Sequence, residues 1–137
     1  MKITLYTEYA LRVLLYLGLH EERLCSVAEI AARYAISRSH LTKVVNNLGH
    51  LGVIETLRGR NGGLKLARKA DEIPLGQVIR HTEGGDHLPD CAACTLGPAC
   101  RLPGVLDEAM EAYLAVFDKY TVADILKPKS GLLRLLA

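Results

Sequence analysis

Residues 26–66 carry the pattern that most restricts how this chain can fold. Ser26-Val27-Ala28-Glu29 fits a capping box, in which the Ser and Glu side chains bind the free amides at the start of a helix. The helix that follows is predicted to reach Tyr34, and Ala35-Ile36 then turns the chain into a second helix over 38–51. Two short helices with so short a connection predict a helix-turn-helix.

After Gly52 the apolar period changes from helical to alternating. Residues 53–57 are rich in β-forming side chains, residues 58–63 include three glycines, and residues 64–66 alternate again. This is the pattern of a β-hairpin, and a hairpin directly after a helix-turn-helix is a wing. The sequence therefore predicts a winged helix-turn-helix, which is a mainly α fold with one small β-hairpin.

Two further helices are expected around this motif. One is predicted over 7–20, with Thr7 as its N-cap, and a short one over 73–81, with Pro74 in its first turn. Residues 82–101 then lose periodicity and contain three of the four cysteines. A stretch of this length without a helical or strand pattern is usually functional or disordered.

A long helix is predicted after Pro103. Apolar residues recur there at alternating steps of three and four up to Tyr120, which is the period of a helix that packs along a partner helix. We expect it to pair with its copy in a second subunit; a core helix within one chain is the alternative. The predicted parts are a winged helix-turn-helix DNA-binding domain (1–81), a cysteine-rich cluster-binding loop (82–101) and a dimerisation helix with a C-terminal tail (102–137).

Charge is unevenly distributed along the chain. Residues 1–81 hold 12 Lys and Arg against 7 Asp and Glu, whereas residues 82–137 hold 5 against 8. Between Arg33 and Lys69 eight basic residues face one acid, Glu55. A concentrated basic segment is the electrostatic signature of a polyanion partner such as DNA, although an ordinary solvated surface has the same composition.

The cellular location follows from what the start of the chain lacks. Met1-Lys2-Ile3-Thr4 does not open a secretory signal, and no run approaches the roughly 20 apolar residues of a membrane span. We therefore expect a cytoplasmic protein with no membrane partner. Thiols stay reduced in that compartment, so the four cysteines point to metal or redox chemistry before a disulfide framework.

Cys91, Cys94 and Cys100 are spaced Cys-x2-Cys-x5-Cys. Thiolates gathered within ten residues select zinc or an iron–sulfur cluster. Structural zinc prefers four protein ligands, and a fourth is missing locally, so an iron–sulfur cluster meant to react is favoured. A thioredoxin-like dithiol expects a βαβ context that is absent here; a disulfide in oxidised protein stays open. Cys25 is interpreted as a packing residue.

Several segments together resemble the nitric-oxide-sensing repressors of the bacterial winged-helix family that also contains the iron–sulfur regulator IscR. The residues that carry the resemblance are Thr7-Glu8-Tyr9-Ala10-Leu11-Arg12, Ser37-Arg38-Ser39-His40-Leu41, Arg58-Gly59-Arg60-Asn61-Gly62-Gly63, Pro98-Ala99-Cys100-Arg101-Leu102 and Tyr120-Thr121-Val122-Ala123-Asp124. The resemblance implies a homodimer with one iron–sulfur cluster, [2Fe-2S] or [4Fe-4S], per subunit. It also implies repression of nitric-oxide detoxification genes while the cluster is intact, and release from DNA when nitric oxide attacks the iron.

The sequence departs from that family in two places. The family usually places more residues between its first and second cysteines, which makes Cys91 the least secure ligand. IscR-like members carry a His shortly after the last cysteine, whereas Arg101-Leu102-Pro103-Gly104 follows here. Some members take a fourth ligand from an acid near the partner's N-terminus, and Glu8 matches that position; a first-turn helix carboxylate is the alternative. His87 and Asp90 are local substitutes.

The same motifs suggest how DNA would be read. A recognition helix contacts bases and phosphates from its N-terminal half, and the wing would reach a minor groove or a phosphate. The predicted DNA-binding residues are Arg38, Ser39, His40, Lys43, Arg58, Arg60 and Asn61. A symmetric dimer requires a near-palindromic operator in double-stranded DNA.

Other functions remain to be weighed against this one. A sensor on the same fold could control cluster assembly, redox state or cysteine supply. An electron-transfer or thiol redox protein leaves the basic segment and the wing unexplained, and a zinc-stabilised binding module is a further alternative. We therefore predict a regulator and not an enzyme.

Overall fold

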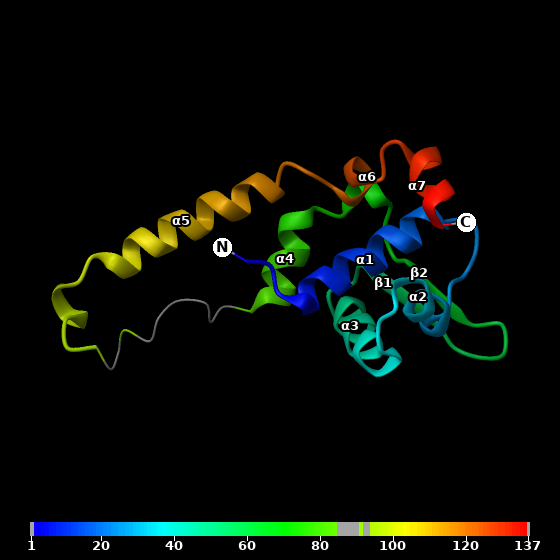
Figure 1. Cartoon of the computed structure of the whole chain (residues 1–137), viewed down its shortest axis with the longest axis horizontal. Helices are drawn as coiled ribbons and strands as arrows, with labels where there is room; N and C mark the ends of the chain where they lie inside the picture. Colours follow the sequence, from blue (N-terminus) through cyan, green and yellow to red (C-terminus); the bar gives the residue numbers. More distant parts are fainter. Residues whose placement is uncertain (1, 85–90, 92–93, 137) are drawn as a thin grey trace.

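The computed structural model describes residues 2–84, 91 and 94–136, and it shows a head from which one long helix projects (Figure 1). We call residues 2–84 and 118–136 the head, and helix α5 the arm. In chain order the elements are α1 (Leu5–Leu19), α2 (Val27–Tyr34), α3 (Arg38–His50), β1 (Ile54–Leu57), β2 (Gly63–Leu66), η1 (Ala70–Glu72), α4 (Leu75–Glu83), η2 (Gly97–Ala99), α5 (Leu102–Phe117), α6 (Val122–Ile125) and α7 (Lys129–Leu136).

Helix α1 is central to the core of the head and begins earlier than predicted. Its N-cap is Thr4, whose hydroxyl accepts a hydrogen bond from the amide of Thr7 (3.2 Å). The prediction of Thr7 as the cap was wrong, because Thr7 lies inside the first turn. There it is fully buried and shares a hydrogen bond with the hydroxyl of Thr82 (2.7 Å). A polar side chain at this position is therefore satisfied by a distant helix.

The helix-turn-helix forms as predicted. Ser26 and Glu29 make the expected capping box at the start of α2, and Ala35 in the turn adopts a left-handed conformation (φ 52°). Helix α3 buries one apolar face in the head, made of Leu41, Val44, Val45 and Leu48.

The hairpin also forms, and strands β1 and β2 pair antiparallel with Ile54 opposite Leu66. It is tied to the head by a bridge between Cys25 and Leu64, and Cys25 is buried, which confirms it as a packing residue. The turn between the strands needs glycine, since Gly59 has φ +111° and a Cβ at Gly62 would collide with the carbonyl oxygen of Leu57.

The C-terminal half differs from prediction in two details. Pro74 lies just before α4 as its N-cap residue, and α4 continues to Glu83. The C-terminal tail, expected to be apolar over residues 132–136, instead belongs to helix α7, whose Leu132, Leu133 and Leu136 pack against the core. An apolar run of this length could not be distinguished from a tail by composition, because helix α1 supplies the surface it packs on.

The arm contrasts with the head in exposure. Among its 16 residues only Leu114 is buried, and the rest of the helix extends away from the head (Figure 1). Leu102, Val105 and Val116 are 52%, 58% and 50% exposed. None of the helices in the described part of the chain is both long and apolar enough to cross a membrane.

Candidate DNA interface and cysteine site

Helix α3 presents the polar face that a recognition helix needs. Arg38, Ser39, His40 and Lys43 are all exposed. The start of the helix is fixed by Ser37, whose hydroxyl accepts a hydrogen bond from the amide of His40 (3.3 Å) and shares one with the hydroxyl of Ser39 (3.0 Å). With the apolar face of α3 buried in the head, these side chains are free to contact an external polyanion.

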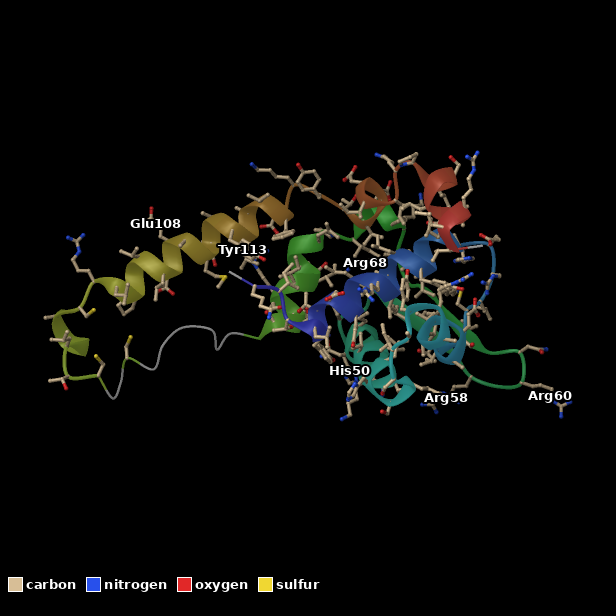
Figure 2. All side chains as sticks on the ribbon, in the orientation of Figure 1. His50, Arg58, Arg60, Arg68, Glu108 and Tyr113 are labelled. Atoms are coloured by element: carbon tan, nitrogen blue, oxygen red, sulfur yellow. The ribbon has the colours of Figure 1, made fainter. Side chains whose placement is uncertain are left out.

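The wing supplies the other predicted contacts. Arg58, Arg60 and Asn61 are exposed, and Figure 2 shows Arg58 and Arg60 extending outward from the hairpin. The glycines of the turn hold its shape without side chains of their own, so the two guanidinium groups project from a defined backbone. Lys65 on β2 pairs with Glu55 on β1 (3.1 Å), which leaves the basic charge concentrated at the tip.

Behind the interface, a polar network connects α1 to the start of α2. The hydroxyl of Tyr16 donates to Glu29 Oε1 (2.8 Å), and Arg23 pairs with the same carboxylate. Hydrogen bonds from Arg23, Tyr16 and the amide of Ser26 lower the pKa of Glu29 to about 2 despite its partial burial. Burial raises the pKa of Tyr34, whose ring lies under the guanidinium of Arg12 (5.5 Å).

In the cysteine segment, backbone amides donate to carbonyls three residues earlier in the chain. The amide of Cys94 donates to the carbonyl of Cys91 (3.3 Å), that of Gly97 to Cys94 (3.0 Å), and that of Cys100 to Gly97 (3.4 Å). Cys91, Cys94 and Cys100 take the first, second and fourth positions in this series of hydrogen bonds, and Gly97 takes the third. Within the segment, Gly97–Ala99 forms a 3-10 helix.

Gly97 has a steric reason to be glycine. A Cβ there would lie 2.7 Å from the carbonyl oxygen of Cys91, closer than real Cβ atoms come, so a side chain would push the turns apart. The three thiols are free, and Cys94 is exposed while Cys91 and Cys100 are half-buried. In donor chemistry, with three free thiols within ten residues, the segment fits an iron–sulfur cluster.

The structure nevertheless does not gather a complete set of ligands. Within residues 2–84, 91 and 94–136, no group of three or more His, Cys, Asp or Glu side chains is close enough to hold a metal ion. The segment from Cys94 to Arg101 lies at the end of the arm farthest from the head, whereas α1, which carries Glu8, is in the head (Figure 1). His87 and Asp90 lie outside the described residues.

Glu8 has a partner in its own helix. It forms an ion pair with Arg12, one turn along α1, and its side chain remains 45% exposed. An open cavity of 570 Å³ lies beside it, lined by Lys2, Ile3, Thr4, Leu5 and Glu8. The sequence interpretation missed the pairing with Arg12, although acid and base four residues apart on a helix are a recognisable signal.

Together the basic α3 face, the wing and the cysteine segment define a winged-helix DNA-binding regulator. The sequence matches the Rrf2 family, described as iron-dependent transcriptional regulators, over residues 3–128. The chain therefore belongs to the Rrf2 family.

Relatives and solved structures agree with this assignment. The chain is 51% identical to the HTH-type transcriptional regulator NsrR of Geobacillus kaustophilus and 44% identical to that of Bacillus subtilis, over 99% of this chain and 97% of each relative. Its fold is similar to that of IscR of T. potens (TM-score 0.76, 26% identity, 94% of this chain and 88% of that one). It is also similar to CymR, the global cysteine regulator of B. subtilis (TM-score 0.73, 27% identity, 91% and 95%).

These findings confirm three of the predictions made from the sequence. The winged helix-turn-helix fold class is confirmed, as is the resemblance drawn from the separate motifs. The role of transcriptional repressor is confirmed at the level of the family. The individual DNA-binding and metal-binding residues stay predictions.

Proposed function

We propose that this protein is a homodimeric repressor whose affinity for a near-palindromic operator depends on an iron–sulfur cluster held by Cys91, Cys94 and Cys100, and that nitric oxide releases it from DNA. The observation that carries the proposal is the set of three free thiols, at Cys91, Cys94 and Cys100, within ten residues of one segment. The proposal is also supported by sequence similarity, because the chain is 44–51% identical over 99% of its length to regulators named NsrR. The cytoplasm, where thiols stay reduced, is the compartment that suits such a site.

The arm supports the homodimer. Leu102, Val105 and Val116 are each at least half exposed on one helix, and Tyr113 on the same helix packs edge-on against Phe117 (5.1 Å between centroids). A continuous apolar stripe on a projecting helix marks an interface. A second copy of the arm has the matching surface, because a two-fold interface is self-complementary.

DNA recognition follows from the head. Helix α3 would enter the major groove with Arg38, Ser39, His40 and Lys43 toward the bases and phosphates. Arg58, Arg60 and Asn61 of the wing would contact the minor groove or the adjacent backbone. Two heads related by a two-fold axis would then read two inverted half-sites.

The cluster would be held by the thiolates of Cys91, Cys94 and Cys100, and when bound it supplies iron that reacts with nitric oxide. Gly97 would allow the backbone between Cys91 and Cys100 to keep its close turns when the cluster is held. Because Glu8 lies in the head and the cysteine segment at the far end of the arm, Glu8 suits a ligand supplied across the dimer. To act in this way Glu8 has to leave Arg12, its partner in α1.

One experiment tests the whole proposal. Protein purified without oxygen is titrated with nitric oxide while its absorption spectrum and its binding to a candidate operator are followed together. We expect a coloured, iron-containing dimer that loses DNA affinity as the iron absorption changes. Colourless, iron-free protein that binds its operator fully would refute the proposal.

Two variants refine the site assignment. If Glu8 is a ligand, Glu8→Ala should change the spectrum or the stability of the cluster. Glu22→Ala is the control: it also removes an exposed carboxylate from the N-terminal part of the chain, but Glu22 lies outside α1, and the spectrum should not change. An unchanged spectrum together with unchanged nitric-oxide sensitivity would remove Glu8 from the ligand set. Release by cysteine or by thiol oxidation, and not by nitric oxide, would instead favour a sensor of cysteine supply or redox state.

A further inference from the structure

The arm joins the head through a small junction between the start of α4 and the end of α5. The amide of Leu75 donates to the carbonyl of Tyr120 (2.9 Å), and the amide of Val122 donates to that of Ile73 (3.0 Å). Beside these backbone bonds, the guanidinium of Arg80 on α4 holds the carboxylate of Asp118, the C-cap of α5, with two hydrogen bonds of 2.6 and 2.8 Å.

Gly76 makes the close approach of Asp118 to α4 possible. It is buried, and a Cβ at this position would lie less than 3.0 Å from both Oδ1 and Cγ of Asp118. Any side chain at position 76 would therefore displace Asp118 from Arg80. Because two parallel hydrogen bonds fix orientation as well as distance, the three residues set how the end of α5 is seated on α4.

Helix α4 is also tied to the DNA-reading part of the head at its other end. Glu83 accepts hydrogen bonds from the amide and the hydroxyl of Thr4 at the start of α1 (2.8 and 2.9 Å). A ring nitrogen of His81 lies 3.2 Å from the carbonyl oxygen of Asn47 in α3. A rigid helix thus connects the base of the arm to the recognition helix.

We propose that Gly76, Arg80 and Asp118 are positioning residues that set the angle between arm and head, and through it the spacing of half-sites that the dimer accepts. The consequence for DNA rests on the dimerisation through α5 proposed above. With two arms held together in the dimer, a rotation at the base of the arm turns each head, and with it α3, relative to the two-fold axis. The separation and orientation of the two recognition helices therefore depend on this junction.

The ion pair between Arg80 and Asp118 fixes the orientation of α5 on α4 more than it stabilises the fold. The side chains of Arg80 and Asp118 are 39% and 42% exposed, and ion pairs that exposed contribute little to stability. The core of the head lies elsewhere, so replacing Asp118 should leave the head folded. A change in geometry can then be separated from unfolding.

The first measurement is a distance between spin labels within one chain. Labels are attached through unnatural ketone side chains, which avoids the native cysteines, at Asn46 on α3 and Asp107 on α5. We expect a narrow distance distribution in the parent protein, and a shifted or at least twofold wider one in Asp118→Ala. Arg80→Lys, which keeps the charge but loses the two-pronged contact, should lie between them, and Glu108→Gln, a control on a side chain that points away from the head in Figure 2, should match the parent.

The second measurement uses a set of operators whose half-sites are moved apart or together by one and two base pairs. For the parent dimer we expect one preferred spacing; for Asp118→Ala and Gly76→Ala the preference over the neighbouring spacings should fall at least threefold, with the cluster spectrum unchanged. Unchanged label distances in Asp118→Ala would overturn the proposal whether or not DNA is bound. If the distances change but the protein is monomeric or does not bind palindromic DNA, the dimer proposal is wrong. The result would then support only the role of the junction in fixing the arm.

Discussion

The head and the arm use apolar residues in opposite ways. In the head, Leu14, Leu41 and Ile73 are completely buried by other parts of the same chain. In the arm, only Leu114 is buried, and large apolar side chains along the helix face outward. The head therefore buries its apolar core within one chain, whereas the arm has an apolar surface that another molecule must cover.

The strongest way to test this contrast is a charge on the arm. Val105→Asp places a carboxylate in the expected interface, so we expect dimers to dissociate. Operator affinity should fall by about 10²- to 10⁴-fold, the advantage of joining two binding heads. Sedimentation and fluorescence anisotropy measure the two effects. Glu108→Asp is the control, and a Val105→Asp protein that remained a tight dimer would show that the arm's apolar side is not the interface.

The reverse test removes volume from the head. Leu14→Ala leaves a cavity in a completely buried site and should lower the free energy of unfolding by about 2–5 kcal/mol. Val105→Ala also truncates an aliphatic side chain to Ala, but Val105 is 58% exposed. It should change the free energy of unfolding by less than about 0.5 kcal/mol at concentrations where the protein is monomeric. Urea denaturation followed by circular dichroism gives both values, and equal losses would contradict the contrast.

What could be predicted from the sequence was local. Ser26 and Glu29 are three residues apart, so the capping box was visible in the sequence, as was the change of period after Gly52. The helical period of the arm predicted a helix with an apolar side, and that helix forms.

What escaped prediction depends on residues far apart in the chain. Thr4 caps α1 while binding Glu83, 79 positions away, and Asp118 meets Arg80 across 38. Sequence spacing does not predict such pairs, because these side chains meet only when α4 packs against α1 and α5. The cysteines could be predicted only in part. Their spacing suggested one shared site, but the need for glycine at position 97 became visible only in the backbone turns that connect them.

That dependence on Gly97 gives a test at the end of the arm. Gly97→Ala puts a methyl group 2.7 Å from the carbonyl oxygen of Cys91, so the turns that space the thiols should open. We expect about tenfold weaker retention of iron against a chelator, comparable to losses seen when residues supporting metal ligands are changed. The dimer and the head should be unaffected by sedimentation and circular dichroism. Gly104→Ala, where a Cβ meets no atom within 4 Å, is the control, and equal iron retention in both variants would rule out this role for Gly97.

The smallest expected effect concerns the polar contacts of Glu29 within the head. The carboxylate of Glu29 binds Arg23 and Tyr16, and its pKa is lowered from 4.5 to about 2. A lowered carboxyl pKa stabilises the folded head above pH 4.5, and this contribution is lost as the pH falls from 4.5 towards 2. Because the pair with Arg23 is partly exposed to solvent, we expect Glu29→Gln to cost only about 1 kcal/mol at pH 7.

The pH dependence separates this charge effect from a packing defect. The stability difference between the parent and Glu29→Gln, measured by urea denaturation at several pH values, should be constant well above pH 4.5 and shrink steadily as the pH falls towards 2, where Glu29 of the folded parent becomes protonated. Glu22→Gln removes an exposed carboxylate nearby and should show no such trend. A Glu29→Gln deficit that persisted unchanged into acid would mean that the amide disturbs packing between α1 and α2, and that the head owes its stability at this place to shape and not to charge.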